Sequence, residues 1–193
     1  GQGLETTYSQ LVQEIFGIEA KSIRIVQGDT DLANGVGSVG SRSAFVGGSA
    51  VVSSSRKLIL KGKELAAEAL EAAAPDIEYR DGRFRIAGTD RTIGIGELAA
   101  RQPARVIRVS DTQTPSTPSW PNGAQVCEVE IDPDTGEVTL AAVTSCDDIG
   151  RIINRAIVEG QIHGGVAQGA GQALWEQVVY DRSSGQLLTG SLM

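Results

Sequence analysis

The sequence predicts an α+β fold in which helices are layered against antiparallel β-hairpins. Two kinds of pattern predict it. Apolar residues recur at helical spacing in three segments, 5–16, 43–74 and 154–178. Turn residues between short apolar runs predict hairpins around 81–82, 132–136 and 183–185. Helices that mix with antiparallel hairpins in this way are typical of the α+β class.

The first part of the chain combines two helices with a long loop. Residues 5–16 predict an amphipathic helix that ends at Gly17, and residues 22–26 predict a strand. A loop rich in Gly, Ser, Asp and Asn follows over 28–42. A second helix is expected over 43–74, closed by Pro75. Its expected buried residues are Leu58, Leu65, Ala69 and Leu70.

The remaining elements follow from turn chemistry. Asp81-Gly82 joins strands 77–80 and 83–86 in a hairpin, and a short helix is expected over 95–101. Three of the six prolines lie in 112–122 and indicate a linker. We therefore expect a first α+β lobe over residues 1–111, with a phosphate-type loop at 28–43. A linker over 112–124 and a second α+β lobe over 125–193 would follow.

The second lobe is expected to contain a hairpin of strands 125–131 and 138–144, a glycine-rich helix and a last hairpin. If Asp132 faces Glu137, Cys127 faces Ala142 and Cys146 lies beyond it, which argues against a disulfide. We interpret both ends of the sequence as cut ends of a longer chain. The last five residues, 189–193, read as a strand that stops mid-run.

Composition excludes several classes of protein. A formal net charge of −7, without a basic stripe, argues against a nucleic-acid binder. The longest uncharged stretch, 160–175, is too short and too polar to span a bilayer. Two cysteines and one histidine make no zinc quartet, so we expect His163 to pack or hydrogen-bond. A reducing cytoplasm is the default location, with the periplasm left open.

Gly35 to Gly40 satisfies the G-x-G-x-x-G pattern of dinucleotide-binding folds. In those folds the first glycine directly follows a strand, whereas here the expected strand ends near Val26. Ser41-Arg42 also replaces the Lys-Ser/Thr pair of a P-loop. A nucleotide-binding protein is therefore the weakest of the alternatives.

The next residues have the chemistry of an anion site. Gly40-Ser41-Arg42-Ser43 lies where a glycine-rich turn enters the second helix. Backbone N–H groups, two hydroxyls and a guanidinium could converge there on one phosphate. The alternative is a loop in which Ser41 or Ser43 only caps the helix.

The last helix carries five glycines between Gly160 and Gly171. Each glycine costs roughly 1 kcal/mol relative to alanine in a helix interior, so something must require bare backbone there. Either another helix packs closely or a bulky ligand lies against it. Gln161 and Gln168 are seven residues apart and share a face among these glycines. The alternative to a ligand site is tight packing with solvated glutamines.

Together these motifs resemble one family, the molybdopterin-binding large subunit of xanthine dehydrogenases, aldehyde oxidases and aerobic carbon monoxide dehydrogenases. Five segments occur in order across nearly the whole chain. They are Gly1-Gln2-Gly3-Leu4-Glu5-Thr6, Gln27-Gly28-Asp29-Thr30-Asp31, Gly40-Ser41-Arg42-Ser43, Asp147-Asp148-Ile149-Gly150-Arg151-Ile152-Ile153-Asn154 and Val158-Glu159-Gly160-Gln161-Ile162-His163-Gly164-Gly165-Val166-Ala167-Gln168-Gly169.

The resemblance implies an oxidoreductase that holds molybdenum on molybdopterin, in bacteria often as its cytosine dinucleotide. Such enzymes hydroxylate a small-molecule substrate with oxygen from water and pass electrons to iron–sulfur centres and a flavin (FAD). Carried over by position, Gln2 and Gly3 contact the pterin and Ser41, Arg42 and Ser43 hold the phosphate region. Gln168 lies beside the molybdenum, and Gln161 is a further cofactor contact.

The resemblance also implies what this segment lacks. The family's catalytic glutamate lies in a Gly-x-Gly-Glu-like segment, which does not occur here, so no catalytic residue and no direct metal ligand is assigned. The expected partners are the rest of the large subunit and iron–sulfur and flavin subunits or domains. The segment alone is expected to be inactive. The rival hypothesis is a noncatalytic interaction module whose glycine-rich helix is a packing face.

Overall fold

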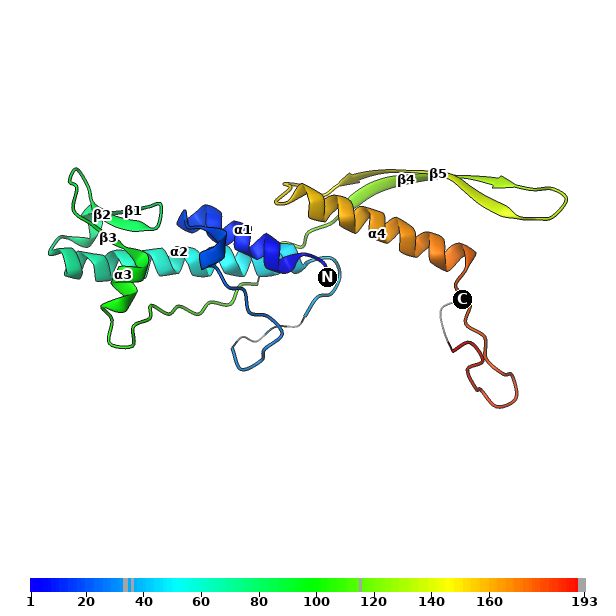
Figure 1. The fold of residues 1–193 in the computed structure, drawn as a ribbon, viewed down its shortest axis with the longest axis horizontal. Coiled ribbons are helices and arrows are strands. Elements are labelled where there is room, and N and C mark those ends of the chain that lie inside the picture. The colour runs from blue at the N-terminus through cyan, green and yellow to red at the C-terminus, as the bar shows by residue number, and fades with distance from the viewer. Residues whose placement is uncertain (33–34, 36, 115, 191–193) are drawn as a thin grey trace. The chain divides into compact units, whose positions relative to one another are not determined.

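The computed structural model describes residues 1–32, 35, 37–114 and 116–190. The chain forms two compact units, which we name unit 1, Gly3–Ser119, and unit 2, from Trp120 onward. Each unit combines helices with antiparallel strands (Figure 1), which confirms the predicted α+β class. Residues 191–193, part of the strand expected at the end of the chain, lie outside the described residues.

Two helices that run in the same direction form one side of unit 1 (Figure 1). Helix α1, Leu4–Phe16, ends at Gly17, whose φ of 62° is left-handed, as the sequence predicts. Helix α2 spans Ser43–Leu70. The hydroxyl of Tyr8 donates a hydrogen bond to the carbonyl of Ser43 at 2.8 Å, and Leu11 lies against Gly48. Because contacts advance together along both helices, α1 and α2 are parallel.

Two sequence predictions in unit 1 are wrong. Helix α2 ends at Leu70 rather than Ala74, because Glu71 adopts a left-handed φ of 52°. The Ala72 amide then donates to the Ala67 carbonyl at 2.9 Å, which closes the helix before Pro75 is reached. The strand expected over 22–26 does not form, and residues 23–27 have no regular secondary structure. A short 3-10 helix at Ala20–Ser22 precedes them, and no described segment supplies a pairing partner.

A three-stranded antiparallel sheet packs against the C-terminal half of α2. Strands β1, Ile77–Arg80, and β2, Arg83–Ile86, pair in the predicted hairpin, and β3, Thr92–Gly94, adds a third strand that the sequence pattern missed. The turn has positive φ at both Asp81 and Gly82, as Asp-Gly hairpins require. The short helix α3, Ile95–Ala100, follows as predicted, and a 3-10 turn at Ala74–Asp76 precedes β1.

The core of unit 1 lies where α2, the sheet and α3 meet. Phe84 is completely buried, and its ring contacts the backbone of α2 at Gly62. A Cβ atom at Gly62 would lie 2.3 Å from the ring, so this helix position requires glycine. Of the expected buried residues Leu70 is buried, while Leu58, Leu65 and Ala69 are half-buried. The core comprises Ala66, Ala67, Leu70, Ile77, Phe84, Ile93 and Leu98.

Unit 2 begins with a long hairpin. Strand β4, Asn122–Ile131, pairs with β5, Val138–Asp148, and it starts three residues before the expected Gln125. A β-bulge between Glu128 and Val129 shifts the register, so Cys127 faces Val143 and not Ala142. The predicted register was wrong because it assumed continuous pairing of the two strands, and the sequence pattern gave no indication of the extra residue. Both cysteines are free and exposed.

Helix α4, Arg155–Leu174, follows the hairpin, with Asn154 capping its first turn. It ends four residues before the expected Val178, and none of its residues is buried. The last expected hairpin is present as a single bridge, Tyr180 with Leu187. Among the described residues, no helix is long and apolar enough to cross a membrane.

Candidate functional site

The first candidate site lies at the paired heads of α1 and α2 in unit 1. Gly3 caps the start of α1 with a left-handed φ of 80°, and Ser43 is the first residue of α2. The Tyr8–Ser43 hydrogen bond ties the two heads together. Each helix N-terminus presents free N–H groups and the positive end of a helix dipole. Two such ends side by side favour an anion more than one end does.

A tight turn leads into α2. Gly37, Gly40 and Ser41 have positive φ angles of 76°, 57° and 53°, and the hydroxyl of Ser43 donates to that of Ser38 at 3.0 Å. The N-cap residue is Arg42, and its side chain makes no capping hydrogen bond. The interpretation that Ser41 or Ser43 occupies the N-cap position is therefore wrong. The exposed Arg42 guanidinium remains available at the head of the helix.

The nucleotide-binding motif of residues 35–40 finds no support in the fold. Val36 lies outside the described residues, and no strand precedes the motif in the part of the chain that the structure describes. A dinucleotide fold needs a strand that leads directly into the first glycine. The glycines of this loop instead shape the turn before Arg42.

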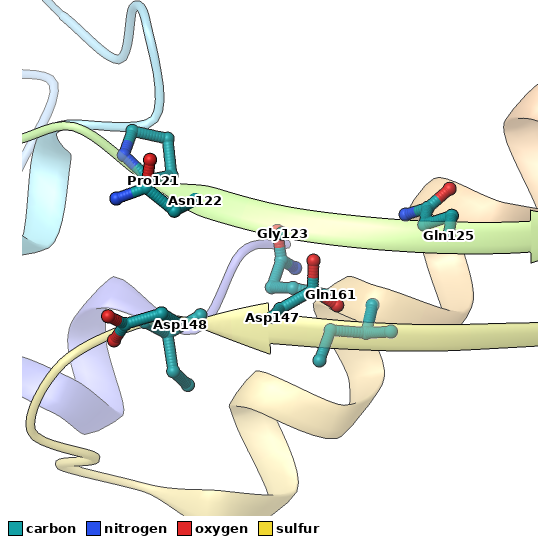
Figure 2. A pocket seen from close by; sticks show the side chains of 9 residues that line it. Pro121, Asn122, Gly123, Gln125, Asp147, Asp148 and Gln161 are labelled. Carbon is teal, nitrogen blue, oxygen red and sulfur yellow. The ribbon is translucent and has the colours of Figure 1, made fainter.

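The second candidate site is a pocket of about 370 Å³ in unit 2, formed by the start of β4, the end of β5 and the first half of α4 (Figure 2). Gln161 and Ile162 of α4 belong to its lining, and Gln161 lies near Asp147 (Figure 2). Planar amides and carboxylates give the pocket paired donors and acceptors for a heterocyclic edge. Its lining residues are Pro121, Asn122, Gly123, Gln125, Asp147, Asp148, Ile149, Gln161 and Ile162.

The two adjacent aspartates have different roles. Asp147 accepts a hydrogen bond from the Ser145 hydroxyl and lies over Gly123, where a Cβ atom would be 2.5 Å from its carboxylate oxygen. Asp148 accepts from the Gly150 amide at 3.0 Å, as a turn-forming aspartate does. The glycine thus makes room for the Asp147 carboxylate beside the pocket, which the sequence did not reveal.

The glycine-rich part of α4 has open space beside its backbone, and Gly165 and Gly169 line a cavity of about 240 Å³ together with residues of β4 and β5. A Cβ atom at Gly160, Gly164, Gly165 or Gly169 would meet no atom within 4 Å. Packing inside the described chain therefore does not account for these four glycines. Gln168 is exposed and does not line the pocket that contains Gln161, although both belong to α4.

His163 differs from its expected role. It is exposed and makes no hydrogen bond to the described residues, so the expectation of packing or hydrogen bonding is wrong for this chain. No group of three or more His, Cys, Asp and Glu side chains is arranged to hold a metal ion in the described ranges. The site in unit 1 fits an anionic group, because hydroxyl, guanidinium and backbone N–H groups dominate it. The pocket in unit 2 instead offers amides and carboxylates, which fit a heterocyclic edge.

Sequence reasoning missed two features. The parallel packing of α1 and α2 brings Gly3 and Ser43 to the same end of unit 1. The sequence signal for this packing is the pair Gly47 and Gly48, whose lack of side chains lets Tyr8 and Leu11 lie close to α2. The pocket in unit 2 was the second, since its walls come from segments far apart in sequence.

Comparison with known proteins shows the family of this chain. The family profile described as "Molybdopterin cofactor-binding domain" matches residues 1–193. The chain belongs to this molybdopterin cofactor-binding family. The 6-hydroxypseudooxynicotine dehydrogenase complex subunit gamma of Paenarthrobacter nicotinovorans is 36% identical over 204 residues, which cover all of this chain and 25% of that subunit.

Two further relatives agree. The carbon monoxide dehydrogenase large chain of Hydrogenophaga pseudoflava is 36% identical over 202 residues, again covering all of this chain and 25% of its own length. The crystal structure of quinoline 2-oxidoreductase from Pseudomonas putida 86 matches with a TM-score of 0.79 at 35% identity, over 99% of this chain and 26% of that one. The chain thus spans about a quarter of the relatives that it matches, and the predicted family is confirmed.

Proposed function

We propose that this chain is the cofactor-binding part of a molybdenum hydroxylase large subunit, and that the paired heads of α1 and α2 bind the phosphate region of the cofactor. The observation that carries the proposal is the parallel pair of helix N-termini beside Arg42. The Tyr8–Ser43 hydrogen bond of 2.8 Å supports it, because it holds both heads at one end of unit 1. The family binds molybdopterin, and the phosphate of that cofactor is the anion that these N-termini would bind.

Individual roles follow from chemistry. Arg42 gives a charge-assisted bond to phosphate, Ser41 gives a hydroxyl donor and Ser43 gives its backbone N–H at the start of α2. Gln2 and Gly3, at the head of α1, contact the pterin side of the cofactor. A cytosine dinucleotide form would add a second phosphate for the same donors.

The two glutamines of α4 have separate roles. Gln161 offers its amide to the planar edge of the cofactor, and the pocket that it lines supports this role. Gln168 lies on the same helix and offers an amide to the terminal ligands of the molybdenum. The bare glycines between them, Gly164 and Gly165, leave room for a flat ligand close to the backbone.

The whole protein is proposed to hydroxylate a small-molecule substrate. When bound, the molybdenum cofactor supplies the redox chemistry, with water as the oxygen source. Iron–sulfur and flavin (FAD) domains or subunits would accept the electrons. The relatives are named for different substrates, carbon monoxide and quinoline among them, and we propose no particular substrate for this protein. We place the protein in the cytoplasm, where exposed Cys127 and Cys146 stay reduced.

The test is Arg42→Ala in the whole protein. A charge-assisted hydrogen bond contributes about 1.5–3 kcal/mol, so we expect cofactor affinity to fall by roughly one to two decades. Molybdenum per protein and released phosphate measure the occupancy. Arg56→Ala is the matched control, because Arg56 is an exposed arginine on the same helix, away from its head.

Full molybdenum occupancy with a lower rate per bound molybdenum would place Arg42 in the reaction and contradict a phosphate role. Full occupancy in Arg42→Ala and in a Gln161→Ala variant, with no change in rate, would remove both side chains from the cofactor contacts. A whole protein that takes up no molybdenum in a host that makes the cofactor would favour the rival hypothesis of a noncatalytic interaction module. The glycine-rich face of α4 would then be a protein-binding face.

A further inference from the structure

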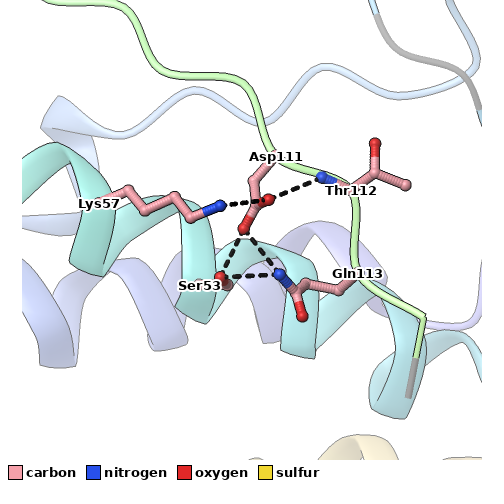
Figure 3. Close-up of polar contacts among 5 residues, drawn as sticks. All are labelled: Ser53, Lys57, Asp111, Thr112 and Gln113. Carbon is pink, nitrogen blue, oxygen red and sulfur yellow. Dashed lines mark hydrogen bonds and ion pairs between the residues drawn. The ribbon is translucent and has the colours of Figure 1, made fainter. Parts of the chain in front are cut away.

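One half-buried aspartate in unit 1 has no part in either candidate site. Asp111 lies in the extended segment after α3, and only 8% of its side chain is exposed. Its carboxylate accepts hydrogen bonds from Ser53 at 2.5 Å, Lys57 at 2.6 Å and Gln113 at 2.8 Å (Figure 3). The Thr112 amide donates to the same group at 3.0 Å. Four donors thus converge on one side chain.

The partners of Asp111 come from two segments far apart in sequence. Ser53 and Lys57 are four residues apart on α2 and therefore share one helix face. Lys61 continues that face by another turn, and its ammonium donates to the Arg108 carbonyl at 3.2 Å. The α2 face formed by Ser53, Lys57 and Lys61 thus receives the segment 108–113 by polar contacts.

We propose that residues 106–114 form a releasable strap, and that Asp111 is the latch that fastens it to α2. The proposal does not depend on the proposed function. Ile107 packs against the core cluster, but no residue of the strap is fully buried. The strap is therefore held beyond Ile107 mainly by the carboxylate cluster and the Lys61 contact. Segments with few buried apolar contacts open at lower free energy than the core.

The latch lies close to the end of unit 1, so it affects the connection to unit 2. Unit 1 ends at Ser119, soon after the strap. With the latch closed, the chain is anchored to α2 as far as Gln113. With the latch open, the last anchors are Ile107 and the Lys61 contact to the Arg108 carbonyl, and the unanchored connection to unit 2 becomes longer. Asp111 is thus a positioning residue that sets how much free chain joins the two units.

The charge of the cluster agrees with this role. Hydrogen bonds from Lys57, Ser53 and Gln113 lower the pKa of Asp111 far below its ordinary value, so the latch is a carboxylate at neutral pH. Lys57 is half-exposed and supplies the balancing charge. An amide in place of the carboxylate would keep the shape and lose the charge-assisted bonds.

Limited proteolysis of the whole protein tests the latch. We expect Asp111→Asn to accelerate trypsin cleavage after Arg108, which lies in the strap, by about tenfold, a factor that one charge-assisted bond can carry. Hydrogen–deuterium exchange in β1, β2 and β3 should stay unchanged. Asp90→Asn is the matched control, because Asp90 is exposed and lies outside the cluster. Lys57→Met should accelerate the same cleavage, and adding it to Asp111→Asn should bring little more.

Three results would overturn the proposal. Equal strap cleavage in Asp111→Asn and in the unchanged protein would show that the carboxylate does not fasten the segment. Equal acceleration of strap cleavage and of exchange in the β1–β3 sheet would show that Asp111 supports the whole of unit 1 and that the strap is not separable. Additive effects of Asp111→Asn and Lys57→Met would mean that the two side chains do not form one latch.

Discussion

Unit 1 and unit 2 differ in how they bury apolar side chains. All the buried hydrophobic residues of the described chain lie between Phe16 and Leu98, in unit 1. In unit 2 every residue of β4 is exposed and α4 buries none of its residues. Trp120 and Trp175 are 77% and 65% exposed. Unit 1 therefore has a core of its own, whereas the described part of unit 2 has ordered elements without one.

This difference shows that regular secondary structure and burial have separate causes. The elements of unit 2 are set by local chemistry, such as the Asn154 cap on α4 and the Asp132 turn that joins β4 to β5. Large contiguous apolar surface on a soluble protein marks an interaction face. The relatives are about four times as long as this chain, and we propose that the remainder of the large subunit covers unit 2.

Loss of the central core side chain should have the largest effect. Phe84→Ala should lower the free energy of unfolding of the chain by about 3–5 kcal/mol, because Phe84 is completely buried among α2, β1 and β3. Urea denaturation followed by circular dichroism measures it. Trp175→Ala in unit 2 is the aromatic control and should change stability by less than about 0.5 kcal/mol. Equal shifts would mean that the two units share one core.

Two helical glycines, one in each unit, test the same difference in burial between unit 1 and unit 2. Gly62→Ala should cost about 1–3 kcal/mol, because the new methyl group would overlap the buried Phe84 ring. Gly165→Ala meets no atom within 4 Å, so the chain should gain up to about 1 kcal/mol from helix propensity. In the whole protein Gly165→Ala should instead reduce molybdenum content. A loss of stability in the chain for Gly165→Ala would show that α4 packs more tightly than the structure indicates.

The smallest expected effect concerns Tyr79 in unit 1. Burial, together with the nearby Asp81 charge, raises the pKa of Tyr79 to about 12, although a hydrogen bond from the Gly82 amide opposes the shift. A raised pKa in the folded state favours the neutral phenol. The contribution of Tyr79 to the free energy of unfolding is therefore fully present below pH 10. It is lost as the pH rises from 10 towards 12.

Tyr79→Phe should remove this alkaline loss of stability. At neutral pH it should cost about 0.5–1.5 kcal/mol, since the Tyr79 hydroxyl donates to the Phe16 carbonyl at 2.9 Å. Thermal unfolding between pH 8 and pH 12 measures both effects. Tyr180→Phe, at an exposed position in unit 2, is the control. An unchanged pH profile in Tyr79→Phe would assign the alkaline loss to other groups.

The sequence by itself determined what depends on neighbouring residues. Asp81-Gly82 predicted its hairpin because few residues adopt positive φ at two successive positions. Gly17 marked the end of α1 for the same reason. The order of five motifs predicted the family, and each of them is a local string of residues. Gly40-Ser41-Arg42-Ser43 was likewise recognised as an anion-binding turn before a helix.

Only the tertiary structure decided what depends on segments far apart in the chain. The bulge that places Cys127 opposite Val143 and the absence of the strand expected at 22–26 reflect strand pairing that no local pattern encodes. The parallel heads of α1 and α2 and the Asp111 latch depend on contacts across 35 and 58 residues of sequence. Such contacts form only when the chain is folded, because burial and hydrogen bonding over that separation must first offset the entropy of closing a long loop.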